Sequence, residues 1–134
     1  MKHEILTQQL IGLFYDVYNE LGHGFLESIY QKAFVLALQQ AGLRFAQQCP
    51  ISVTFRGIEM GEFRADLVVE SLVIVELKAV QALESAHERQ LTNYLRATKF
   101  EVGLLFNFGP KAQVRRLIFD NDRKVARAAT AASL

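Results

Sequence analysis

The sequence predicts an α/β fold in which a mixed β-sheet is flanked by helices, and three observations support this. Apolar residues repeat at helical spacing over two segments near the N-terminus. The period then changes to two over three consecutive segments, and a further helical pattern precedes two more strand-like segments. Three antiparallel strands followed by a crossover helix and another strand give a sheet with both parallel and antiparallel pairs.

Two amphipathic helices are expected before the sheet. The first covers residues 5–21, where apolar residues recur every three or four positions. Gly22-His23-Gly24 interrupts this pattern, and a second helix is expected over residues 25–40. Gly42 is placed to end that helix in the left-handed conformation.

The expected strands are short and bounded by turn-forming residues. They cover residues 51–55, 62–70, 72–80, 101–108 and 114–119. Glu70-Ser71 separates the second strand from the third, which predicts a hairpin, and the last strand is expected at the sheet edge. A helix from Ser85 to about Phe100 precedes the fourth strand, with Ser85 and Glu88 at capping-box spacing.

Length and composition favour one domain over residues 1–134, with the core at about 5–120 and a frayed end at 126–134. The net charge of +1 gives no long-range attraction for a polyanion, so nucleic acid would need a local basic patch. A basic run late in the chain is either such a patch or a solvated surface: Lys111, Arg115, Arg116, Arg123, Lys124 and Arg127. With one cysteine, no secretory signal and no long apolar run, a cytoplasmic protein without membrane contact is expected.

Charged residues interrupt the apolar third strand at two positions. Glu76 and Lys78 lie two residues apart, so their side chains project from the same face of a strand. Charges on a central strand are costly to bury unless they have partners or line a cleft. The pair therefore indicates either a functional cleft or a strand with one solvent-exposed face and a surface ion pair.

Asp66 lies in the preceding strand, in another apolar run. A two-residue hairpin loop would place it opposite Val75, on the wrong face, whereas a three-residue loop or a bulge would place it beside Glu76. Two carboxylates held together repel, and a divalent cation such as Mg²⁺ relieves the repulsion. A metal there could acidify a water molecule, and Lys78 could stabilise charge in the transition state. No Cys/His cluster suggests zinc.

Asp66 followed by Glu76-x-Lys78 resembles the D…(D/E)xK signature of the restriction-endonuclease-like, or PD-(D/E)xK, nucleases. Gly24–Tyr30 matches the GxxExxY motif of one family in that superfamily, and Gln90–Tyr94 resembles the QxxxY element of RecB-like nuclease domains. Ala65 stands where the signature often has proline. The resemblance covers residues 5–120 and implies an αβββαβ core with an extra N-terminal helix and a C-terminal edge strand.

The resemblance also implies roles for individual residues. Asp66, Glu76 and the backbone carbonyl of Leu77 match the metal-binding groups, and Glu27 matches a helix glutamate that reaches the site from the side. Lys78 matches the active-site lysine. The implied cofactor is Mg²⁺ or Mn²⁺.

Two helix faces would border the resulting cleft. Gln90 and Tyr94 match the helix pair beside the site, and their spacing of four places them on one helix face. Each residue also has a purely structural interpretation. In that interpretation Glu27 favours the positive end of its helix, Tyr30 and Tyr94 are core aromatics, and His87 is a solvated helix residue.

Three functions are compatible with these patterns. The leading hypothesis is a Mg²⁺-dependent phosphodiesterase acting on DNA in preference to RNA, directed by nucleic-acid structure or ends, or by a partner protein or homodimer. The second is a catalytically silent module that binds nucleic acid or protein. The third is a plain scaffold, with Asp66 and Glu76 on different faces and residues 114–119 in a dimer contact.

Overall fold

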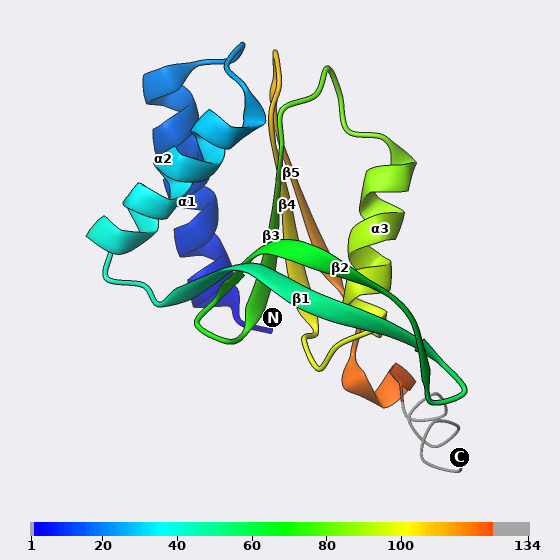
Figure 1. The fold of residues 1–134 in the computed structure, drawn as a ribbon. Helices are drawn as coiled ribbons and strands as arrows, with labels where there is room; N and C mark the ends of the chain where they lie inside the picture. Colours follow the sequence, from blue (N-terminus) through cyan, green and yellow to red (C-terminus); the bar gives the residue numbers. More distant parts are fainter. Residues whose placement is uncertain (1, 125–134) are drawn as a thin grey trace.

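The computed structural model describes residues 2–124 and has the expected α/β architecture (Figure 1). In chain order the elements are α1 (Glu4–Leu21), α2 (Glu27–Gln40), β1 (Phe45–Phe55), β2 (Ile58–Val69), β3 (Val73–Lys78), α3 (Ser85–Arg96), β4 (Val102–Phe108), β5 (Ala112–Ile118) and the 3-10 helix η1 (Asn121–Lys124). The end expected to be frayed, 126–134, lies outside the described residues. Within residues 2–124 no helix has the length and apolar character needed to cross a membrane.

The five strands form one mixed sheet in the order β1-β2-β3-β4-β5. Only β3 and β4 are parallel, and the other three neighbouring pairs are antiparallel. α1 and α2 cover one face and α3 covers the other (Figure 1). The expected mixed sheet and the edge position of β5 are therefore confirmed.

Each face of the sheet has its own apolar core. Alternate residues of β3 point to opposite layers, so Val75 packs beneath α1 and α2 whereas Ile74 packs beneath α3. Phe14 of α1 stacks on Phe106 with ring centroids 4.6 Å apart. Tyr30 of α2 is fully buried, and its hydroxyl donates to the Gly22 carbonyl at 2.6 Å. Tyr30 is thus a core aromatic with a hydrogen-bonded tip.

The strand boundaries differ most from expectation in β1, which begins at Phe45 and not at residue 51. Its first half is mostly exposed and has no alternating apolar pattern, so sequence periodicity could not detect it. β1 and β2 pair along their whole length, from Phe45 opposite Val69 to Phe55 opposite Ile58. Because β3 pairs only with the last residues of β2, the far part of this hairpin leaves the sheet as a two-stranded ribbon.

Helix α3 begins at Ser85 as expected, but its capping and its C-terminal end differ from expectation. The expected capping box of Ser85 and Glu88 is wrong, because the N-cap is Glu84. Its backbone N–H donates to His87 Nδ1 at 2.9 Å, so His87 caps the helix and is not merely solvated. The helix ends at Arg96, before the expected Phe100.

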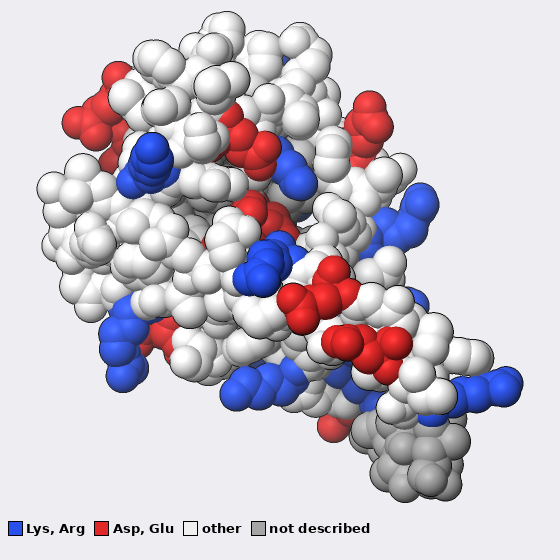
Figure 2. Space-filling view, in the orientation of Figure 1, with Lys and Arg blue, Asp and Glu red and all other residues white. Residues whose placement is uncertain are grey.

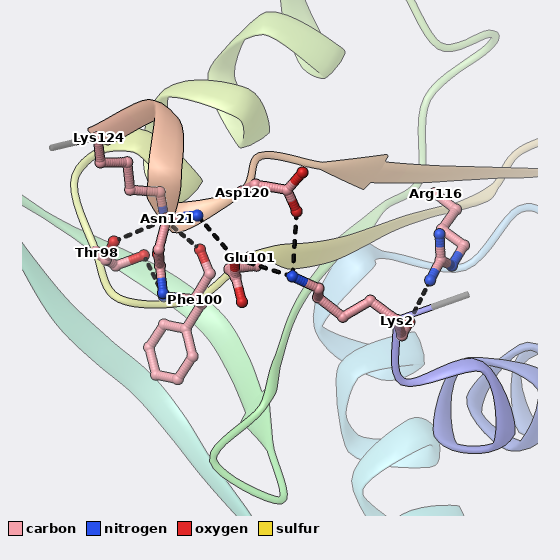
Figure 3. A network of polar contacts seen from close by, with 8 residues as sticks. All are labelled: Lys2, Thr98, Phe100, Glu101, Arg116, Asp120, Asn121 and Lys124. Atoms are coloured by element: carbon pink, nitrogen blue, oxygen red, sulfur yellow. Dashed lines mark hydrogen bonds and ion pairs between the residues drawn. The ribbon is translucent and has the colours of Figure 1, made fainter.

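The expected basic run is divided between the two sides of the sheet. Arg115 lies 3.6 Å from Glu88 of α3. The guanidinium of its neighbour Arg116 donates to the carbonyl of Lys2, on the side of α1 (Figure 3). Successive strand residues point in opposite directions, so a basic stretch of sequence does not make one basic surface.

The segment between β3 and α3 is not part of a strand, and hydrogen bonds from side chains of β4 and β5 hold its backbone. Asn107 is fully buried; its Oδ1 accepts from Val80 N at 2.9 Å, and its Nδ2 donates to Val80 O at 3.0 Å. Gln113 Oε1 accepts from Leu83 N at 2.9 Å and from Asn107 Nδ2 at 3.0 Å. A Cβ at Gly109 would lie 2.1 Å from the Val80 carbonyl oxygen, so the approach requires glycine.

Gly109→Ala should lower the free energy of unfolding by at least about 2 kcal/mol, because the new methyl group overlaps backbone that cannot rotate away. Urea unfolding at pH 7 measures this. Gly61→Ala is the matched control, since a Cβ there meets nothing within 4 Å; its change should stay within about 0.5 kcal/mol. Equal stability of the two variants would show that the close packing at Gly109 is not required.

Candidate metal centre between two strands

The turn between β2 and β3 sets which side chains face each other. Glu70 and Ser71 both have positive φ angles, 52° and 55°, and Leu72 N donates to Val69 O at 3.0 Å. Leu72 is an extra residue, because Val69 pairs with Val73. The loop therefore has the three-residue length that the sequence argument required, and the same register places Asp66 opposite Glu76.

Contacts with Arg44 hold this unusual turn. The Glu70 carboxylate accepts from the Arg44 backbone N–H at 2.6 Å and from its guanidinium at 3.0 Å. Glu70 N donates to Arg44 O at 2.8 Å. These hydrogen bonds lower the pKa of Glu70, so the ionised carboxylate stabilises the turn.

Asp66 and Glu76 meet where β2 and β3 separate. Asp66 Oδ2 accepts from Leu77 N at 2.8 Å, and Glu76 Oε2 accepts from Asp66 N at 3.2 Å. Each carboxylate thus bonds to the backbone of the opposite strand. The two side chains lie together and not on opposite faces of the sheet, which excludes the plain-scaffold geometry.

Glu76 is buried to 5% exposure and faces the Asp66 carboxylate. Burial and the neighbouring acid raise the pKa of Glu76 well above its ordinary value, while Lys78 acts weakly in the opposite direction. Without a cation, the ionised form of this pair is unfavourable. Such an arrangement is typical of functional sites, where strongly perturbed carboxylates lie close together.

Glu27 and Lys78 lie around the carboxylate pair. Glu27 is the first residue of α2, and partial burial raises its pKa. Lys78 lowers the pKa of Glu27 and Asp66 raises it, so both charges lie close enough to act on the Glu27 carboxyl. Glu27 therefore lies both at the positive end of its helix and near the carboxylate pair. Its structural and its functional interpretations are compatible.

Tyr94 and Gln90 border the pair from α3. The Tyr94 ring stacks on Phe63 of β2, with centroids 3.7 Å apart. Burial and the charges of Glu76 and Asp66 raise the pKa of Tyr94 to about 12, while a hydrogen bond with Gln90 acts against this. Tyr94 is therefore protonated at neutral pH, and its hydroxyl can donate a hydrogen bond toward the site.

The donor set fits a hard divalent cation. Two carboxylates, with water and substrate oxygens, satisfy the preference of Mg²⁺ for few protein ligands. Residues 2–124 contain no group of three or more His, Cys, Asp or Glu side chains close enough to hold a metal. Glu27 therefore stands outside the immediate pair, and a role for it as a ligand would need a bridging water.

Sequence reasoning did not single out three residues beside the site. Phe63, Arg89 and Arg96 line a groove that also includes Gln90 and Tyr94. Arg89 and Arg96 are seven residues apart and so share one side of α3, which helical periodicity could have indicated. Phe63 could not be found this way, because it comes from the ribbon.

The comparisons with known proteins agree with this architecture. A family model described as the PD-(D/E)XK nuclease superfamily matches residues 4–117, so the chain belongs to that superfamily. Proteins of this superfamily generally use divalent metal ions. A search of the curated proteins found no matching relative.

Among solved structures, the chain resembles the crystal structure of a protein named SSO0001, with a TM-score of 0.54 and 17% identity. The alignment covers 79% of this chain, and the chain spans 57% of that protein. At this identity the likeness concerns the fold, which is restriction-endonuclease-like as expected.

Glu76→Gln should stabilise the metal-free protein by about 1–3 kcal/mol at pH 7. Burial beside Asp66 raises the pKa of Glu76 to about 9, so folding must protonate a carboxyl that is ionised in the unfolded chain, whereas glutamine needs no proton. Thermal unfolding in EDTA measures the change. Glu62→Gln serves as control, since the contact of Glu62 with Arg64 is loose, at 3.8 Å between half-exposed side chains. If Glu76→Gln unfolded at a lower temperature than wild type in EDTA, the carboxylates would not be repelling each other.

Proposed function

We propose that this chain is a metal-dependent phosphodiesterase that hydrolyses nucleic acid, DNA in preference to RNA. One observation carries the proposal: the Asp66 and Glu76 carboxylates lie together at the point where two central strands separate, with Lys78 following on the same strand. Within the superfamily we assign the chain to the GxxExxY group, because Gly24–Tyr30 carries that motif at the start of α2.

Asp66, Glu76 and the carbonyl of Leu77 would hold Mg²⁺ or Mn²⁺, with Glu27 acting through water. Bound there, the ion would supply an acidified water molecule and positive charge beside a phosphodiester oxygen. Hydrolysis adds the water oxygen to phosphorus and breaks one phosphorus–oxygen ester bond, and the departing sugar oxygen takes a proton. These assignments account for the choice of two acids and one amine in an otherwise apolar pair of strands.

Lys78 would act directly on the reacting groups. Its ammonium group is a compact cation, and it lies on the strand that carries Glu76, close enough to affect the carboxyl of Glu27. From there it would orient the attacking water or stabilise charge that develops on the phosphate. Tyr94 and Gln90 would donate hydrogen bonds at the border of the cleft.

The charge distribution bears on how a substrate would be selected. Acidic and basic side chains are interspersed on the face shown in Figure 2, with no broad area of one sign. Long-range attraction of a polyanion is correspondingly weak. Choice of cleavage position would then depend on nucleic-acid structure or ends, or on a partner protein or second copy of the chain.

Lys78→Ala should abolish cleavage while leaving metal binding largely intact, because the amine acts on the substrate and not on the metal ligands. The rate should fall at least about 100-fold, measured on fluorescent single- and double-stranded DNA with Mn²⁺. Lys32→Ala, an exposed lysine on α2, is the control and should cleave normally. Comparable cleavage by wild type and Lys78→Ala, in preparations free of contaminating nuclease, would defeat the assignment.

Metal binding is tested separately by thermal unfolding with and without Mn²⁺. Wild type and Lys78→Ala should both gain stability with Mn²⁺ by mass action. Asp66→Asn and Glu76→Gln should lose that gain, since each removes one anionic ligand but keeps the hydrogen-bond acceptor. Metal stabilisation without cleavage by wild type would favour the silent binding module.

A further inference from the structure

A groove runs between the exposed side of α3 and the β1–β2 ribbon, next to the carboxylate pair. Its volume is about 530 Å³, and it is lined by Val53, Phe63, Ala86, Arg89, Gln90, Asn93, Tyr94, Arg96 and Ala97. Its lining includes Gln90 and Tyr94, and Tyr94 lies within reach of the charges of Asp66 and Glu76. The groove therefore shares Gln90 and Tyr94 with the proposed active site.

The charged residues that line this groove are all cations. Arg89 and Arg96 are exposed and seven residues apart on α3, which places them about 10 Å apart along one side of the helix. The Arg89 guanidinium makes no hydrogen bond or ion pair with another of residues 2–124. A guanidinium group in this situation is well suited to bind a phosphate.

A second hollow extends the groove beyond the end of α3. It is lined by Phe119, Arg123 and Lys124, and it shares Arg96 with the first. The Arg123 guanidinium lies over the Phe119 ring, 4.3 Å from its centroid. The Lys124 amine instead donates to the carbonyls of Thr98 and Phe100, at 2.9 and 2.7 Å (Figure 3). Lys124 thus fixes η1, and Arg123 adds a third guanidinium to the path.

We propose that this groove along α3 binds one strand of nucleic acid and leads it to the carboxylate pair. Arg89, Arg96 and Arg123 contact successive phosphates, and Phe63 offers an apolar wall for a base. The inference rests on the proposed function, because it assigns a path for the polymer that the site would cleave.

A single strand fits the groove better than a duplex does. Its walls are α3 and the ribbon. The stacked rings of Tyr94 and Phe63, with centroids 3.7 Å apart, join these walls and so limit the width of the groove. Cations along a narrow groove with an aromatic side chain are the combination that single-strand binding uses. The local row of cations also explains how a chain with a net charge of +1 could hold a polyanion.

The test measures binding without cleavage. A 12-nucleotide fluorescein-labelled oligothymidylate is titrated with protein in EDTA, and fluorescence anisotropy is followed at several salt concentrations. Arg89→Ala/Arg96→Ala should weaken binding at least about 10-fold at 50 mM salt and reduce the slope of log K against log salt by about 1.4, the value for two lost phosphate contacts. The control Lys32→Ala/Lys111→Ala removes the same charge from exposed positions elsewhere and should change affinity less than about 2-fold.

A gain of affinity guards against effects on folding. Asn93 is exposed in the groove between the two arginines, so Asn93→Lys should tighten binding about 3-fold. Equal losses in the two double variants, no gain with Asn93→Lys, or tighter binding of a 12-base-pair duplex than of the single strand would each overturn the proposal.

Failure of the groove and failure of the proposed function give different results. Binding through the groove without cleavage in Mn²⁺ would support the groove proposal and contradict the phosphodiesterase proposal. If wild type cleaves DNA and Arg89→Ala/Arg96→Ala cleaves it equally well, the phosphodiesterase proposal is supported and the groove proposal is contradicted.

Discussion

The register of the β2–β3 hairpin is the constraint on which the site depends. Side chains on a strand alternate between faces, so one residue more or less in the loop would turn Asp66 away from Glu76. The loop holds its length with two residues of positive φ and one extra residue, and Arg44 fastens it through Glu70. A surface contact at one end of the hairpin therefore determines which acids meet further along it.

Hydrogen bonds and apolar packing hold Asp66 and Glu76 close together although their negative charges repel each other. Glu76 is almost completely buried beside Asp66, and both carboxylates accept backbone hydrogen bonds that fix their positions. Apolar layers on both faces of the sheet supply the stability that makes this arrangement tolerable. A divalent cation would relieve the repulsion between these two fixed carboxylates. The same geometry therefore supports both the proposed metal site and the expected loss of stability without metal.

Sequence patterns predicted the order and type of the elements well, because apolar periodicity reports which face of each helix or strand is buried. They failed where structure depends on contacts between distant segments. The exposed first half of β1 pairs with β2 without an apolar pattern, and the capping of α3 by His87 replaced the expected Ser85 motif. The dipeptide Glu70-Ser71 marks a turn but does not reveal that the loop has three residues. Phe63 reaches Tyr94 only through the ribbon, so no spacing in the sequence indicates it.

Hydrogen bonds to its backbone hold the chain between β3 and α3 in place, while Ala79 and Leu83 pack against the two cores. Asn107 bonds to the N–H and carbonyl of Val80, and Gln113 accepts from the N–H of Leu83. None of these contacts involves a side chain of the connecting segment itself. The side chain of Val80 can therefore change without loss of these hydrogen bonds, whereas the two amides on β4 and β5 that make them are not interchangeable with other residues.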